Sequence, residues 1–243
     1  MKHLLEVIAF DIESCLLAEA SGAHRIELCD NPSEGGTTPS FGLIQQARKN
    51  TSIELYPIIR PRGGDFLYSP QAFEIMKADV LACKQLGCDG VVLGLLHADG
   101  SIDESSTSEL VALAYPMGVT FHRAFDRTPD PFEALEALVQ TGCERILTSG
   151  LQPTALEGLQ LISKLVEKAA DRIIVMPGSG IRSDNIAQIA AVSKATEFHS
   201  SARMQLQSAM QYSNPNMKEK LQHTSIDAAE VQKMIQVLQQ AKQ

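Results

Sequence analysis

The fold follows from one stretch of sequence that occurs three times: AEASGAHRIEL at residues 18–28, ACKQLGCDGVVL at 82–93 and ALVQTGCERIL at 137–147. Each copy indicates the end of a helix, then a glycine, a small residue and the start of a strand. Glycine suits this position because many helices stop at a left-handed residue. A helix-to-strand unit repeated along one chain is typical of a parallel α/β sheet.

The same alternation extends over most of the chain. Apolar runs typical of buried strands occur near residues 4–9, 25–29, 54–60, 90–94, 118–122, 145–149, 172–176 and 196–200. Helical patterns separate them, near residues 12–21, 39–49, 69–86, 104–114, 130–141, 154–169 and 183–192. We therefore predict an α/β fold, a single TIM-like (β/α)₈ barrel. An open doubly wound sheet is the alternative, although no Gly-x-Gly-x-x-Gly motif follows the first strand.

Length and composition agree with one barrel domain over residues 1–243. Chains of this class reach about 250 residues, and 44% hydrophobic with 21% charged content is typical of a globular protein. Residues 203–225 form a long polar connection without clear periodicity. A last helix is predicted at 226–241, where apolar residues recur at helical spacing.

Charge and cysteine content restrict the partners. A formal charge of −8, from 21 Lys and Arg against 29 Asp and Glu, argues against nucleic acid, because phosphate contacts need a basic surface. No apolar run approaches the ~18 residues of a membrane span, and Glu6 interrupts the N-terminus before the core of a signal peptide could form. Five scattered cysteines without a CxxC favour a reducing compartment. We expect a cytoplasmic protein with no membrane partner.

Strand alternation places charged side chains inside the barrel, because the apolar faces of the strands must meet the helices. The interior set is Glu6, Glu27, Arg60, His122 and His199. Buried charges are costly unless they pair, so one interpretation is an ion network, with Glu27 buried against Arg60, that only stabilises the barrel. We favour a functional site, because several of these residues end strands at the C-terminal mouth. In it, Glu27 or His122 exchanges a proton, with Glu6 in support.

The loop after the third strand, RPRGGDF at 60–66, is a candidate anion site. Arg60 and Arg62 flank a rigid proline, and arginine suits bidentate binding of a carboxylate or phosphate. The paired glycines let backbone approach a ligand, and Asp65 belongs to the same candidate site. The alternative is a tight loop with a surface salt bridge between Arg62 and Asp65.

The segment after the fifth strand, HRAFD at 122–126, is a candidate acid–base site. A lone histidine is more often structural, but His122 is followed by an arginine and by Asp126 at a predicted strand end. This grouping makes His122 and Asp126 candidate catalytic residues.

The loops after the seventh and eighth strands are candidate phosphate-binding loops. Barrel enzymes often bind phosphate there with backbone N–H groups. The first loop has glycines and a hydroxyl, and the second has two hydroxyls. The candidate ligand-binding residues are Gly178, Ser179, Gly180, His199, Ser200 and Ser201. The alternative is a pair of ordinary turns.

Metal motifs are weak in this sequence. No His-Glu-x-x-His and no close Cys/His cluster occurs. Cys29, at the end of the second strand, is the best-placed single candidate for a metal ligand. Cu(I), however, prefers two or more soft sulfur donors.

Several motifs together resemble the CutC family, which is named for copper homeostasis. They are RIELC at 25–29, EGGTTPS at 34–40, PIIRPRGGDF at 57–66, TFHRAFD at 120–126, LTSG at 147–150 and EFHSSA at 197–202. The resemblance extends over about residues 4–203. It implies a cytoplasmic TIM-like barrel that forms homo-oligomers, dimers or tetramers, with a role in copper handling. It implies no particular reaction.

One departure from the family concerns copper. The resemblance implies a copper site in those relatives for which Cu(I) binding is proposed. Such relatives have one cysteine at the position of Cys29 and a second cysteine at the position of Ile8. Here Ile8 replaces that thiol. Weak Cu(I) binding is therefore the cofactor expectation, and no other cofactor is expected.

Two functions remain open. One is a role in copper homeostasis through copper binding, which the resemblance implies. The other is a barrel enzyme that acts on a small anionic ligand, carboxylated or phosphorylated, by acid–base chemistry. Isomerisation, aldol cleavage and hydrolysis all fit the second function. No lysine ends a predicted strand, which argues against Schiff-base chemistry.

Overall fold

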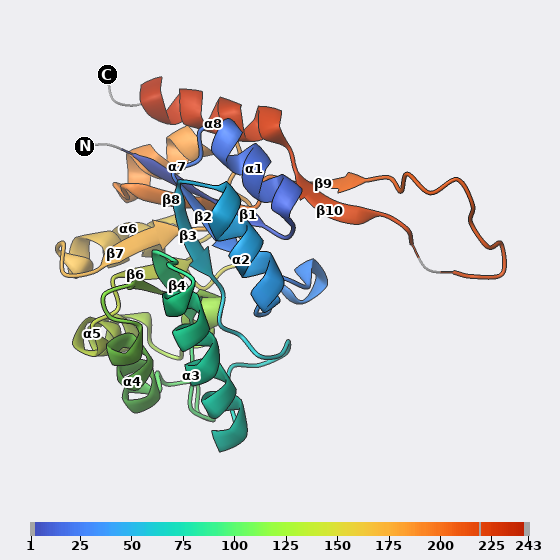
Figure 1. Cartoon of the computed structure of the whole chain (residues 1–243). Helices are drawn as coiled ribbons and strands as arrows, with labels where there is room; N and C mark the ends of the chain where they lie inside the picture. Colours follow the sequence, from blue (N-terminus) through green and yellow to red (C-terminus); the bar gives the residue numbers. More distant parts are fainter. Residues whose placement is uncertain (1–2, 219, 241–243) are drawn as a thin grey trace.

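Eight short parallel strands form a closed barrel in the computed structural model, which describes residues 3–218 and 220–240 (Figure 1). They are β1 (Leu4–Ala9), β2 (Arg25–Leu28), β3 (Glu54–Pro57), β4 (Gly90–Leu93), β5 (Gly118–Phe121), β6 (Arg145–Thr148), β7 (Ile174–Pro177) and β8 (Glu197–Ser200). Hydrogen bonds join them in the orders β3-β2-β1-β8 and β4-β5-β6-β7. The N–H of Ile59 donates to the carbonyl of Val92 (2.7 Å) beside β3 and β4, and β7 lies beside β8. The strand order is therefore cyclic, which confirms the barrel and excludes the doubly wound alternative.

Helices follow the strands as the sequence predicted. They are α1 (Ile12–Ala20), α2 (Phe41–Asn50), α3 (Pro70–Gln85), α4 (Glu104–Ala114), α5 (Pro131–Thr141), α6 (Leu159–Ala169), α7 (Ile186–Ser193) and α8 (Ala228–Gln240). In the three repeats, the glycine after the helix has a positive φ: Gly22 (89°), Gly87 (76°) and Gly142 (81°). A side chain would be strained in this conformation, so glycine ends these helices without cost.

Four helices begin two or more residues after the predicted start, including those expected from 39 and 183, which begin at Phe41 and Ile186. The helix expected from residue 154 begins at Leu159, because 154–158 form turns and Gly158 packs its backbone against that of Gly150. The helix expected at 226–241 begins at Ala228, because Ile226 ends a strand. Residue 241 lies outside the described residues.

The connection 203–225 contains regular structure that the sequence did not reveal. β9 (Arg203–Leu206) pairs antiparallel with β10 (His223–Ile226), and the two strands lead into a long arm that projects from the barrel (Figure 1). Apolar side chains on the arm are exposed: Met204, Leu206, Met210, Tyr212, Met217 and Leu221. The pattern was missed because each strand has only four residues, and the second, HTSI, does not alternate polar and apolar side chains. The expected homo-oligomer stays a prediction.

The outer core lies between strands and helices. Leu5, Val7, Ile26, Leu28 and Phe121 are all fully buried there. The five cysteines are free and buried, which fits their expected role as small apolar side chains. Among the described residues, none of the helices is both long and apolar enough to span a membrane.

The barrel interior holds an ion network near the N-terminal ends of the strands. Arg25 is 4% exposed, and its guanidinium contacts Glu197 (2.9 Å), Glu54 (2.8 Å) and Glu6 (3.4 Å). Arg145 is 1% exposed and donates from Nε to the same carboxylate of Glu197 (2.7 Å). Pairing of this kind makes the burial of these charges tolerable. The expected interior network is present, although the sequence analysis had not assigned Arg25 or Arg145 to it.

An aromatic ring packs against both arginines. The guanidinium carbons of Arg25 and Arg145 lie 4.8 and 5.6 Å from the centre of the Tyr56 ring. A Cβ atom added at Gly90 would lie 2.1 Å from this ring. The missing side chain of Gly90 therefore makes the space in which Tyr56 contacts both cations.

We expect Arg25→Met to lower the free energy of unfolding by about 3–5 kcal/mol, because the change removes one of the two guanidinium groups that neutralise the buried carboxylates. Arg172→Met is the matched control, since Arg172 pairs with Glu136 at the surface with side chains 40% and 42% exposed. Surface pairs contribute about 0–1 kcal/mol. Urea unfolding measures both changes, and a loss below about 1 kcal/mol in Arg25→Met would contradict this account of the interior.

Candidate functional site

A cavity of about 1080 Å³ opens at the C-terminal ends of the strands. Its walls come from the strand ends and the loops that follow them. The residues used below are Ile8, Glu27, Arg60, Asp65, Phe66, His97, His122, Arg123, Asp126, Arg127, Ser179, Gly180, His199, Ser201 and Arg203. Most of the residues singled out from the sequence therefore lie around one cavity, as the barrel topology requires.

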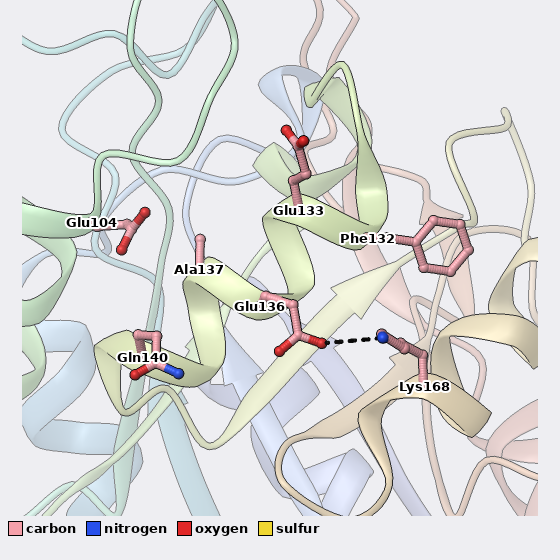
Figure 2. A pocket seen from close by; sticks show the side chains of 7 residues that line it. All are labelled: Glu104, Phe132, Glu133, Glu136, Ala137, Gln140 and Lys168. Atoms are coloured by element: carbon pink, nitrogen blue, oxygen red, sulfur yellow. Dashed lines mark ion pairs between the residues drawn. The ribbon is translucent and has the colours of Figure 1, made fainter.

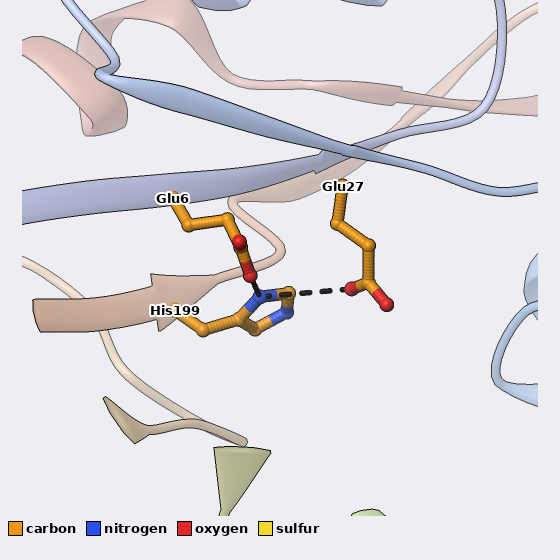
Figure 3. Close-up of side chains that lie close together, drawn as sticks. All are labelled: Glu6, Glu27 and His199. Atoms are coloured by element: carbon orange, nitrogen blue, oxygen red, sulfur yellow. Dashed lines mark hydrogen bonds and ion pairs between the residues drawn. The ribbon is translucent and has the colours of Figure 1, made fainter. Parts of the chain in front are cut away.

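Glu6, Glu27 and His199 meet at the bottom of the site (Figure 3). Nδ1 of His199 lies 2.8 Å from Oε1 of Glu6 and 3.6 Å from Oε2 of Glu27. Strand register brings them together, because Glu6 of β1 pairs with His199 of β8 and Ile8 of β1 pairs with Glu27 of β2. All three are buried, and Glu27 and His199 line the cavity.

Glu6 and His199 form an ion pair. Burial raises the pKa of Glu6, but the hydrogen bond with His199 and the charges of Arg25, His199 and Arg145 outweigh it and lower the pKa to about 2. Burial lowers the pKa of His199, but its bond to Glu6 and the charges of Glu27 and Glu6 raise it above its usual value. Glu6 is therefore a carboxylate that holds a proton on His199.

Glu27 differs from Glu6. Burial raises the pKa of Glu27 to about 7; the charge of Glu6 adds to this effect, and the charges of His199 and Arg203 oppose it. The sequence analysis placed Glu27 near Arg60, but the structure places it beside His199 instead. Without a guanidinium in contact, Glu27 exists in both protonation states near neutral pH, which suits a general acid or base.

Arg60 holds the wall of the cavity together. Its Nη1 donates to the carbonyls of Glu34 (2.7 Å) and Gly36 (2.8 Å), and its Nη2 donates to the carbonyl of Gly64 (2.8 Å). The fork expected to bind an anion is therefore occupied by backbone. The Nε of Arg60 is buried and has no hydrogen-bond partner among residues 3–218 and 220–240.

Arg62 and Asp65 form the surface salt bridge that was the alternative interpretation of their loop. Nη2 of Arg62 lies 2.6 Å from Oδ1 of Asp65, and the side chains are 44% and 73% exposed. Arg62 also donates to the carbonyls of Gly63 and Leu67. Asp65 lies on the cavity rim, whereas Arg62 is used within its own loop.

His122 lines the cavity at the end of β5. Its Nδ1 accepts a hydrogen bond from the N–H of Ala124 (3.2 Å). Burial and then the charge of Arg60 lower the pKa of His122 to about 3. The ring is therefore neutral near pH 7, and the candidate acid–base role of His122 stays a prediction.

Asp126 positions a neighbouring loop. Its carboxylate accepts hydrogen bonds from Ser149 (N–H, 3.1 Å; Oγ, 2.9 Å), from the N–H of Leu151 (3.2 Å) and from Nε of Arg123 (2.7 Å). Thr148 also donates to it. These contacts use both oxygens, so the arrangement gives Asp126 a positioning role in place of the expected catalytic one.

The expected phosphate-binding loops reach the cavity only in part. Ser179, Gly180 and Ser201 line it, and Gly178 and Ser200 do not. The hydroxyl of Ser200 donates to the carbonyl of Ile181 (2.7 Å), and that of Ser179 donates to the carbonyl of Pro153 (2.8 Å). Both hydroxyls therefore hold their own loops, and the phosphate-binding role stays a prediction.

Three arginines that the sequence analysis did not select also line the cavity: Arg123, Arg127 and Arg203. Arg127 and Arg203 are exposed and, within the described part of the chain, form no ion pair. Arg203 stacks on Phe10 (5.0 Å), and its charge acts on Glu27 and His199. Each of these arginines comes directly after a predicted strand or a strand-end motif, and this feature of the sequence could have identified them as candidates.

Cys29 lies in an apolar cluster with Ile8, Tyr56, Ile58 and Val92. A Cβ atom added at Gly36 would lie 3.1 Å from its Sγ, so backbone covers the thiol. Burial, then the charge of Glu27, raises the pKa of Cys29 well above its usual value. Ile8 and Cys29 share the interior as expected, but the cluster provides one sulfur where Cu(I) favours at least two.

Glu6, Glu27 and His199 also have the spacing of a metal-binding set, with one oxygen or nitrogen from each within 4.8 Å of the others. Carboxylate oxygens suit hard cations, and none of these donors is a thiolate or thioether that would select Cu(I). Nδ1 of His199 is already bonded to Glu6. We therefore interpret the cluster as a proton-transfer site.

A second, smaller pocket of about 500 Å³ lies on the outer helices (Figure 2). It is formed by α5 with Glu104 of α4 and Lys168 of α6. Lys168 pairs with Glu136 at 3.9 Å across it. The pocket lies away from the strand ends and holds none of the predicted site residues.

Comparisons with known proteins agree with this architecture. The model of the CutC family matches residues 3–204. A CutC family protein of Chromobacterium violaceum is 54% identical over 212 residues, 87% of this chain and 86% of the relative. The human copper homeostasis protein cutC homolog is 50% identical over 214 residues, 88% of this chain and 78% of the relative. The crystal structure of the copper homeostasis protein CutC of Streptococcus agalactiae has a TM-score of 0.78 at 33% identity, over 82% of this chain and 98% of that one.

Glu27 should make stability depend on pH. Its pKa is raised from 4.5 to about 7 in the folded protein, so its contribution is present below about pH 4.5 and is lost as the pH rises through 7. As the pH rises from about 4.5 to 7, we expect the free energy of unfolding to fall less in Glu27→Gln than in the unmodified protein. Urea unfolding at several pH values measures this difference.

Glu167→Gln, at an exposed position of α6, is the control for the loss of a single carboxylate. If Glu27→Gln and the unmodified protein showed the same pH dependence, Glu27 would not hold a proton near neutral pH.

Proposed function

The chain belongs to the CutC family, and from this premise and the geometry of its cavity we infer that it is a barrel enzyme acting on a small anionic metabolite by acid–base chemistry. The observation that carries this inference is Glu27, a buried carboxyl with a pKa of about 7 that faces the cavity. A group with a pKa near the working pH is an effective general acid or base. A carboxylate that only stabilises the fold through ion pairs would have a pKa well below its usual value, as Glu6 does.

The cavity supports an anionic substrate despite the net charge of the chain. Arg127 and Arg203 present guanidinium groups to it without carboxylate partners in the described residues. Local positive charge attracts anions even where the whole protein is negative. In this proposal the arginines bind the carboxylate or phosphate of the substrate, and Glu27 removes or returns a proton.

Glu6 and His199 support Glu27. The pair carries no net charge, so it adds little to the electrostatic cost of ionising Glu27. The charge of His199 also offsets the negative charge of Glu27 after Glu27 has become a carboxylate, with Oε2 of Glu27 3.6 Å from Nδ1. This arrangement keeps the pKa of Glu27 near neutrality.

A role in copper homeostasis is the second candidate, and the name of the human relative favours it. Copper would then be cargo bound in the barrel. The surroundings of Cys29 do not fit such a site, because Ile8 and Ile58 occupy the space where a second sulfur would have to lie. The copper role therefore rests on the family alone.

We expect inorganic phosphate or a phosphorylated sugar to raise the melting temperature, because a ligand that binds only the folded state stabilises it. Arg203→Gln should reduce the shift, and Arg172→Gln, at the outer surface, should preserve it. Glu27→Gln should bind these anions and lose at least about 100-fold of any turnover found in a metabolite screen. No shift with any small anion would contradict the proposal.

For copper, we expect weak competition against a Cu(I) chelator, equal for the unmodified protein and for Cys29→Ser. The physical reason is the single, covered thiol. Tight binding of one Cu(I) that disappears in Cys29→Ser would instead establish the copper site.

A further inference from the structure

We propose that the Nε2–H of a neutral His122, with the Nε–H of Arg60 beside it, donates hydrogen bonds to the carbonyl oxygen of the substrate while Glu27 moves a proton at the neighbouring carbon. The inference rests on the proposed function and specifies its substrate class. The substrate is then a small aldehyde, ketone or 2-oxo acid that also carries a phosphate or carboxylate.

The hydrogen bonds of His122 determine where its proton lies. Nδ1 accepts from the N–H of Ala124 at 3.2 Å, so Nδ1 has no proton of its own. In a neutral imidazole the proton is then on Nε2. The ring can take this position because Gly94 has no side chain: a Cβ atom there would lie 2.4 Å from Nδ1.

The two proposed donors are buried. Nε2 of His122 and Nε of Arg60 have no hydrogen-bond acceptor in good geometry among the described residues, although both residues line the cavity. Arg60 is 5% exposed and His122 is 4% exposed, so water does not solvate them freely. Buried donors are almost always paired. The hydroxyl of Tyr68 interacts with Arg60, whereas a ligand in the cavity would supply the acceptor for Nε2 of His122.

Arg60 and His122 both pack against the ring of Phe66. The guanidinium carbon of Arg60 lies 5.0 Å from the centre of the Phe66 ring, and the His122 ring lies 4.9 Å from it. The remaining nitrogens of Arg60 are held by three backbone carbonyls. Nε of Arg60 is therefore fixed in position, which is what a donor to a developing charge requires.

The chemistry is proton abstraction next to a carbonyl. The Glu27 carboxylate takes a proton from the carbon, the C–H electron pair becomes a C=C bond, and the carbonyl π pair moves onto oxygen. The resulting enolate oxygen accepts from His122 and Arg60. In a substrate with a hydroxyl on the first carbon, the hydroxyl proton passes to the enolate oxygen and the hydroxyl carbon becomes the new carbonyl carbon. Glu27 returns its proton to the former carbonyl carbon, which gives an isomer without an oxidant or a further reactant. A neutral imidazole serves here because it donates a hydrogen bond without giving up a full proton.

Two related phosphates test the inference: dihydroxyacetone phosphate, which has the carbonyl, and glycerol 3-phosphate, which has a hydroxyl in its place. We expect the unmodified protein to bind the ketone about tenfold more tightly, the effect of one good hydrogen bond to a fixed donor. His122→Leu should abolish this preference and leave the affinity for glycerol 3-phosphate within about twofold. His122→Gln, which keeps an N–H donor, should retain part of the preference.

His97→Leu is the matched control, because His97 lines the same cavity but is exposed. It should keep the preference. Nitrogen-15 NMR of the histidine-labelled protein, with His122 assigned from the spectrum of His122→Gln, gives a readout that needs no ligand. We expect a proton on Nε2 and none on Nδ1 from about pH 5 to 8.

Any one of four results would overturn the inference and leave the anion site standing. Two concern the His122 ring: a proton on Nδ1, or an imidazolium between about pH 5 and 8. The other two concern binding: equal affinity for the two phosphates, or a preference for the ketone that survives in His122→Leu. Absence of binding by both phosphates would instead contradict the proposed function, and the inference with it.

Discussion

Charge balance inside the barrel is the constraint on which the rest of the structure depends. The interior contains carboxylates from β1, β2 and β8, and burial of each as an anion would be very costly without cations. Arg25 and Arg145 supply the cations, but only near the N-terminal ends of the strands. Glu197 is neutralised by both arginines, Glu6 by Arg25 and His199, and Glu27 is left without a guanidinium in contact. The closed end of the barrel is therefore ionic and stable, whereas the open end keeps a carboxyl that can exchange its proton.

The internal repeat explains how the ionic layer is built. Arg25, Gly90 and Arg145 occupy equivalent positions at the start of β2, β4 and β6. Two copies of the repeat thus supply a guanidinium, and the third supplies empty space that the Tyr56 ring fills. One supersecondary unit, changed at a single position, provides both the cations and the gap that lets an aromatic ring pack against them. The same unit ends its helix with glycine each time, so the backbone repeats while the interior side chains differ.

The motif at 57–66 takes part in the site mainly by shaping it. Arg60 connects the turn at 34–36 to the loop around Gly64, and Phe66 packs against both Arg60 and His122. Arg62 and Asp65 close their own loop at the surface. The arginines available to an anion, Arg127 and Arg203, come from other segments. A motif dense in functional residue types can therefore serve mostly to position a few donors, here Arg60 Nε and His122 Nε2.

The sequence by itself determined the barrel, because the repeat, the alternation of strands and helices and the period of two within strands are local patterns. It also placed Glu6, Glu27, His122 and His199 inside, since each lies opposite apolar neighbours on its own strand. It could not decide which charges pair, because pairing depends on the register between strands far apart in the chain, such as β1 with β8. For the same reason, Glu27 was expected beside Arg60 and is found beside His199. The protonation of each group also required the tertiary structure, since Glu6 and Glu27 are the same residue type and equally buried. Only the distance of Glu6 from Arg25 and His199 makes it a permanent carboxylate and leaves Glu27 able to titrate.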